Sequence, residues 1–161
     1  MRKEPDKLQA SVNRATILMM LVGLVLLIAT TLLVGPPVRA LYRAMLVGLV
    51  MTAANYILAV IALRLGLWTV RGAWPVFGYP LSMVFGWFSL TSCFCLMLTL
   101  FHRWWPMLTF VALAGVGGSL WDLRVHTRAG ILVLGRAKRW QVVLYWVVLA
   151  FAAALLFLSW V

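Results

Sequence analysis

Apolar stretches free of charged residues alternate with short polar segments along the whole chain. A helix needs about 20 predominantly apolar residues to cross the hydrocarbon core of a membrane. Stretches close to this length occupy five ranges, at residues 16–34, 44–63, 81–101, 104–120 and 142–161. We therefore predict an all-α integral membrane protein, in which residues 1–161 form one membrane domain, a bundle of five transmembrane helices.

Two connecting segments carry apolar residues of their own. Residues 65–79 are rich in Gly, Trp and Pro, which predicts an interfacial loop or a short helix at the level of the lipid headgroups. The apolar piece Ile131–Leu134 lies inside a basic segment and is too short to cross the membrane. It either stays at the membrane surface or dips into the inner leaflet.

The basic residues predict the orientation of the helices. The chain has 14 Lys and Arg but only three Asp and Glu, which gives a net charge of +11. With a cytoplasmic N-terminus, the basic residues that fall in outer loops are only Arg39, Arg43 and Arg103. The positive-inside rule then predicts N-in/C-out, and we expect a bacterial-type inner (plasma) membrane with its lipids as partners. No nucleic-acid partner is expected, because the basic residues are scattered over several segments.

Small residues on three helices predict close helix contacts. Ser82, Gly86, Ser89 and Cys93 share one face of the third helix at a period near 3.6. The small-xxx-small spacing, which lets two backbones approach closely in a membrane, recurs in two other helices, as Gly115 with Ser119 and Ala150 with Ala154. We expect these eight residues to lie in packing interfaces.

Three side chains with polar groups stand inside apolar stretches. Asn55 and Tyr56 belong to the second span and Trp87 to the third. An amide in lipid needs a partner, and a buried indole N–H wants an acceptor. The structural interpretation is a hydrogen bond between helices, and the functional one is contact with an apolar ligand that has a polar group. These three residues are the candidate ligand site.

A polar group is also predicted at the inner membrane interface, formed by Asp122, Arg124 and His126. Asp122 and His126 have the i, i+4 spacing that places them on one helix face if the fourth helix continues. The structural interpretation is an ion pair of Asp122 with Arg124, Arg128 or a lysine of the basic loop. The alternative is an acid–base pair. With three acidic residues and two histidines in the chain, we predict no catalytic residue, no metal site and no cofactor.

Two families offer partial resemblances. Five spans with nine Trp resemble in outline the tryptophan-rich sensory protein or translocator family, whose members bind tetrapyrroles and sterols. Its Trp- and Pro-rich first loop and Asn-containing last helix do not occur here. The segment from Pro80 to Trp87, followed by Asp122, is similar to membrane carotenoid hydratases, over less than a third of the chain. The acidic residues of such an active site are missing apart from Asp122, and we assign the chain to neither family.

Short loops and helix faces made of small residues favour a non-catalytic subunit or assembly factor that packs against other subunits of a larger membrane complex. The alternative is a carrier or binding protein for a hydrophobic small molecule such as an isoprenoid, a pigment or a lipid. A third hypothesis is an enzyme that modifies a lipid or isoprenoid through Asp122 and His126. Protein partners or an apolar molecule that stay with the purified protein would distinguish the first two hypotheses.

Overall fold

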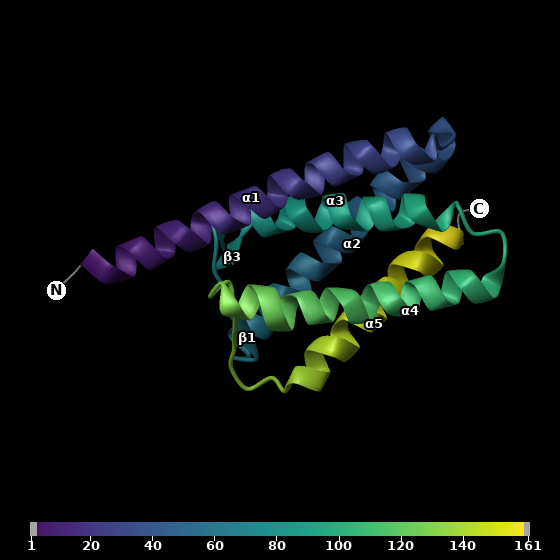
Figure 1. The fold of residues 1–161 in the computed structure, drawn as a ribbon. Helices are drawn as coiled ribbons and strands as arrows, with labels where there is room; N and C mark the ends of the chain where they lie inside the picture. Colours follow the sequence, from purple (N-terminus) through teal and green to yellow (C-terminus); the bar gives the residue numbers. More distant parts are fainter. Residues whose placement is uncertain (1–2, 160–161) are drawn as a thin grey trace.

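Five long helices make up most of the computed structural model, which describes residues 3–159 (Figure 1). Each of them is long and apolar enough to cross a membrane, as predicted. They are α1 (Lys3–Val34), α2 (Val38–Arg64), α3 (Leu81–Leu98), α4 (Trp104–Trp121) and α5 (Arg139–Leu158). The last two residues of the predicted span 142–161 lie outside the described part of the chain.

The helix ends differ from the apolar stretches in several places, and α2 and α5 begin before them, at Val38 and Arg139. The first helix begins at Lys3, not at residue 16, because the polar segment before the apolar stretch is helical too. Its 32 residues correspond to about 48 Å at 1.5 Å per residue, so its N-terminal turns extend past the other helices (Figure 1). The third helix ends at Leu98, where the Thr99 hydroxyl donates to the Leu96 carbonyl. The fourth continues into the π-helical turn η1 (Asp122–His126).

Four short strands at one end of the bundle correct the all-α prediction. They are β1 (Trp68–Val70), β2 (Pro75–Val76), β3 (Tyr79–Pro80) and β4 (Leu132–Leu134). The first pairs antiparallel with the fourth, and the second with the third. The segment predicted as an interfacial loop or short helix is thus partly strand, and the apolar piece at 131–134 is held by the ladder of β1. Runs of two or three residues are too short to show a strand period in the sequence.

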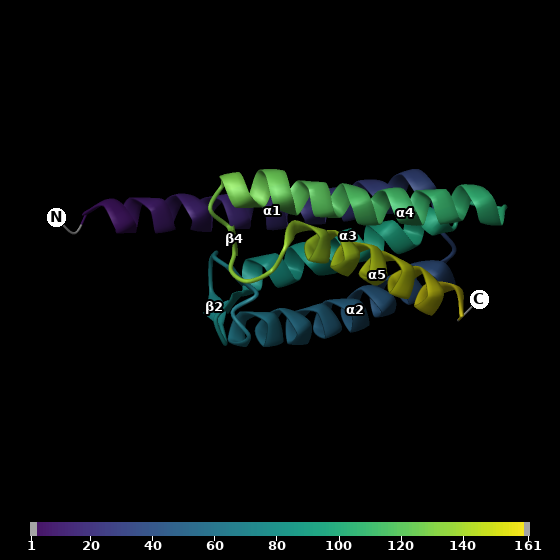
Figure 2. The ribbon, with the colours of Figure 1, turned by 90° about the horizontal axis from the view of Figure 1, so that it is seen from below.

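The helices pack in two groups that meet along the bundle. Helix α1 lies along α3, which also packs on α2, while α4 packs on α5 (Figures 1 and 2). Gly23 of α1 faces the small-residue side of α3, where a Cβ on Gly23 would lie 3.4 Å from the Ser89 Cβ and 3.7 Å from the Gly86 Cα. A Cβ on Gly115 would lie 2.8 Å from the Cα of Val147. Helices α4 and α5 therefore approach each other at backbone distance.

The other predicted packing residues lie as follows. Ser119 is fully buried, and its hydroxyl donates to the Val116 carbonyl in its own helix. Cys93 and Ala154 belong to the apolar core, and Ala150 packs against it. The Ser82 hydroxyl reaches outside its helix and donates to the carbonyl of Ala73. Ser82 thus fixes a loop rather than a second helix.

The apolar core fills the end of the bundle that is opposite the strands. Its members include Val47, Leu96, Val111 and Phe157, one from each of the helices α2 to α5. A second, smaller cluster lies at the strand end and joins Val12, Ala59, Tyr79, Met83 and Ile131. Four of its members, Ala59, Tyr79, Met83 and Ile131, also line a cavity with the polar side chains of Asn55, Asp122 and His126.

Candidate functional site

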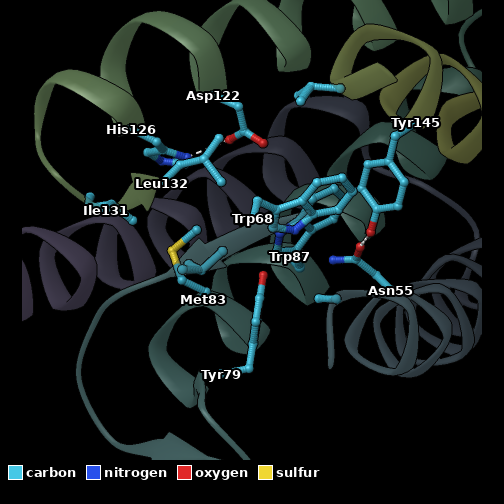
Figure 3. A pocket seen from close by; sticks show the side chains of 13 residues that line it. Asn55, Trp68, Tyr79, Met83, Trp87, Asp122, His126, Ile131, Leu132 and Tyr145 are labelled. Carbon is cyan, nitrogen blue, oxygen red and sulfur yellow. Dashed lines mark hydrogen bonds and ion pairs between the residues drawn. The ribbon is translucent and has the colours of Figure 1, made fainter. Parts of the chain in front are cut away.

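A small cavity lies near the strand end of the bundle, among α2, α3, α5, η1 and the strands β1, β3 and β4 (Figure 3). Its volume is about 30 Å³, which is room for one or two water molecules. Its polar and aromatic lining comes from six of these elements, and the residues are Asn55, Trp68, Tyr79, Trp87, Asp122, His126 and Tyr145. The structure therefore brings together Asn55 and Trp87 of the predicted ligand site with Asp122 and His126 of the predicted interface site.

The π-helical turn places a carboxylate and an imidazole in direct contact. Nδ1 of His126 lies 2.5 Å from Oδ1 of Asp122. The indole N–H of Trp121 donates to the other ring nitrogen, Nε2, at 3.1 Å. Since Nε2 accepts a hydrogen bond, Nδ1 carries the hydrogen and donates it to the carboxylate. This is the arrangement in which a carboxylate orients an imidazole for proton transfer at Nε2, and π turns occur frequently at functional sites.

The second carboxylate oxygen of Asp122 is bound by another indole. Trp146 of α5 donates its N–H to Oδ2 at 2.7 Å, and its ring stacks on Trp87 with 4.4 Å between centroids. The expected ion pair with Arg124 or Arg128 does not form among the described residues, and both arginines are exposed. Arg124 stands two positions after Asp122, and residues at this spacing do not share a helix face.

Asn55 is the most deeply buried amide at the cavity, with 3% of its surface exposed. Its Oδ1 accepts a hydrogen bond from the hydroxyl of Tyr145. Among residues 7–159 its amide nitrogen makes no hydrogen bond, and this nitrogen points toward Trp87 (Figure 3). The nitrogen is not sealed in the protein interior, because the buried side-chain polar atoms without a partner in the described part of the chain are Thr52 Oγ1 and Ser92 Oγ, and Asn55 lines the cavity. The free donor therefore gives the cavity the ability to bind an acceptor atom.

The two neighbouring tyrosines take different positions. Tyr79 is buried and its hydroxyl points up toward the rings of Trp68 and Trp87 (Figure 3). Burial raises the pKa of Tyr79, as do the nearby Tyr145 and Asp122, so the phenol stays protonated near neutral pH and can donate. Tyr56, in contrast, is not part of the cavity lining. Its hydroxyl donates to the Val76 carbonyl at 3.0 Å, which braces the β2–β3 hairpin.

A contact from α1 holds the loop in front of this hairpin. The backbone N–H of Ala73 donates to the buried hydroxyl of Thr16 at 3.1 Å. Gly72 lies so close to this contact that an added Cβ would be 2.8 Å from the Pro80 Cβ and 2.9 Å from the Thr16 methyl. Thr16 of α1 thus holds the loop that precedes the β2–β3 hairpin, whose second strand carries Tyr79.

Nothing in the described part of the chain groups three His, Cys, Asp or Glu side chains as a metal site requires. Comparison of the chain with protein-family models, with curated proteins and with solved structures gave no match.

Proposed function

We propose that this protein binds an apolar molecule of the membrane, a lipid or an isoprenoid with a polar group, and holds the polar group at the cavity. The observation that supports this proposal is the free amide N–H of Asn55, which lines the same cavity as the Asp122–His126 pair. Polar side chains inside membrane segments are rare and mark functional sites by default. A purely structural bundle would gain as much from apolar residues at these positions.

A second candidate function is acid–base catalysis on the same molecule. It is favoured by the contact between Asp122 and His126 and by the direction in which the imidazole is oriented. In this scheme the Nε2 atom of His126 takes a proton from the bound molecule and later returns one, while Asp122 stabilises the imidazolium. The indole N–H of Trp121 and the sulfur of Met19 lie 3.1 Å and 3.2 Å from Nε2, and both have to move aside for the reacting atom.

The sequence-based hypothesis of a non-catalytic subunit stays a prediction. It differs from the ligand hypothesis in what accompanies the purified protein. Isolation from its source in mild detergent, followed by native mass spectrometry, is expected to show an apolar molecule in stoichiometric amount. Stoichiometric protein partners with no such molecule would support the subunit hypothesis and contradict the proposed function.

The double variant Asn55→Leu/Tyr145→Phe tests the cavity directly. Removing both partners of one buried hydrogen bond with apolar groups of similar shape is close to neutral for stability. We therefore expect a folded protein that loses most of its bound molecule, because the amide donor is gone. The matched control is Tyr56→Phe, which removes a hydroxyl outside the cavity. Equal retention of the molecule by all three proteins would refute a role for Asn55.

We further propose that the strand end of the bundle, and with it the cavity, faces the cytoplasm of a bacterial-type cell. This follows from the predicted N-in/C-out orientation. Cysteine at the exposed Arg136, near β4, should be protected from an impermeant maleimide in intact cells, whereas cysteine at the exposed Arg103, between α3 and α4, should react. Cys93 and Cys95 are buried and provide little background. The reverse labelling pattern would invert the topology.

A further inference from the structure

A second hollow lies beside the cavity, on the outside of the bundle between α2 and α5. Its volume is about 380 Å³, and its surface is almost entirely apolar. The wall from α2 contains Leu58, and the wall from α5 contains Leu144 and Val148, all three of which are exposed. We call this hollow the α2–α5 groove.

The groove and the cavity share two residues, Trp68 and Tyr145. Their rings meet edge to face with 5.4 Å between centroids, so this pair forms the wall that separates the two spaces. The hydroxyl of Tyr145 binds Asn55 on the cavity side. A movement of the Tyr145 ring would therefore open the wall and release the acceptor oxygen of Asn55 in one step.

The cavity and the α2–α5 groove differ in volume, and each suits a different part of one ligand. The cavity holds a water molecule or two and cannot accommodate a lipid-sized molecule. The groove falls within the range of about 300–1,000 Å³ that small-molecule sites occupy. A ligand that places its polar group at Asn55 must keep its bulk elsewhere, and the adjoining groove is large enough.

The position of the groove along α5 indicates what fills it. The groove begins at Ala137 and Trp140, beside the exposed Lys138 and Arg139, and continues through Leu144 to Val148. Basic and Trp residues at a helix end mark the membrane interface, so the rest of the groove extends into the hydrocarbon layer. The medium that reaches it there is the hydrocarbon chain of a lipid.

We propose that the α2–α5 groove binds a long acyl or polyprenyl chain, which enters sideways from the bilayer and delivers the attached polar group between Trp68 and Tyr145. This proposal rests on the proposed function and specifies its substrate class, a single long chain with a polar end. The Trp68–Tyr145 pair is the gate between the chain site and the polar cavity.

The chain site can be tested with a photoreactive lipid. The full chain is placed in phosphatidylcholine vesicles that contain a trace of a fatty acid with a diazirine on its single acyl chain, and irradiated. Peptide mass spectrometry is expected to find several-fold more adducts at Leu144 and Val148 than at Leu113 and Leu155, which are at least as exposed. Equal labelling of all four positions would overturn the proposal, because it would mean that the groove holds only bulk lipid.

Filling the groove provides the second measurement. Val148→Trp should abolish the excess labelling at Leu144, whereas Leu155→Trp, on the same helix but outside the groove, should leave it unchanged. Both sites are exposed, so both variants are expected to fold. Persistence of the excess in Val148→Trp would contradict the proposal.

The two proposals fail in different ways. Excess labelling in the groove together with full ligand retention by Asn55→Leu/Tyr145→Phe would uphold the chain site and contradict the function proposed for the cavity. Uniform labelling together with ligand loss in that double variant would uphold the function and place the entry route elsewhere.

Discussion

Under the acid–base function proposed as the second candidate, Asp122→Asn is expected to leave the protein folded and loaded with its apolar molecule but to stop the chemistry on that molecule. A general acid or base contributes about 10²–10⁴ in rate. In cells where the variant replaces the wild-type chain, the reacted form of the molecule should fall by that factor while the unreacted form accumulates on the protein. Mass spectrometry of the co-purified molecule measures both.

The stability of this variant is the necessary companion measurement. Asp122 accepts hydrogen bonds from His126 and Trp146, and an asparagine presents one acceptor atom to these two donors. Losing one such bond costs about 1–3 kcal/mol, so the protein should unfold earlier in denaturant but remain intact. Arg124→Gln is the control, because it removes an exposed charge nearby without touching the cavity. Equal product from wild type and Asp122→Asn would reduce Asp122 to a structural role.

Gly118→Ala should disturb the Asp122 carboxylate indirectly, by displacing Trp146, which donates a hydrogen bond to it. A Cβ at this position would collide with the ring of Trp146. The ring then has to leave its stacked position on Trp87 and its hydrogen bond to Asp122. Overpacking of this kind costs about 1–3 kcal/mol of stability. The conversion of the bound molecule by the proposed acid–base pair should fall as well.

The control lies one position earlier on the same helix. A Cβ on Gly117 meets no atom within 4 Å, and alanine is favoured over glycine in a helix by up to about 1 kcal/mol. Gly117→Ala should therefore be neutral or stabilising in an unfolding titration. If Gly117→Ala and Gly118→Ala behave alike, the packing of Trp146 against α4 is not as tight as the structure shows.

The helices could be predicted from the sequence because each one contains a long apolar stretch, which is a local pattern. Apolar stretches without charge identify the spans, and only their polar extensions, such as the N-terminal part of α1, were missed. The strands could not be predicted in the same way. β1 has three residues, and its partner β4 comes after two further helices, so the pairing is decided by tertiary structure.

The candidate site was predicted in its parts but not as a whole. Asn55, Trp87, Asp122 and His126 stand out in the sequence as polar or indole groups in or beside apolar helices. No local pattern shows that helix packing brings them to one cavity. Tyr145 and Trp146 were overlooked, although a tyrosine in the interior of an apolar span needs a hydrogen-bond partner, and this signal would have pointed to Asn55.

The partners of Asp122 show why the expected ion pair with a neighbouring arginine does not form among the described residues. Arginines outnumber other candidates near it in sequence, yet they keep their charge at the surface, where solvation is better than in the interior. The neutral donors of His126 and Trp146 bind the carboxylate instead. The i, i+4 spacing indicated the contact of Asp122 with His126, which the structure shows, whereas the predicted ion pair with an arginine is absent among the described residues.

The ladder between β1 and β4 also sets the order of events during synthesis. Trp68 pairs with Leu134, so β1 leaves the ribosome long before its partner exists. Helices α1 to α4 can enter the bilayer while the gate residue Trp68 still lacks Tyr145. Long-range pairing of this kind forms late. The site is therefore complete only after α5 has been synthesised. A nascent chain that still lacks α5 has no finished cavity in which to hold a molecule.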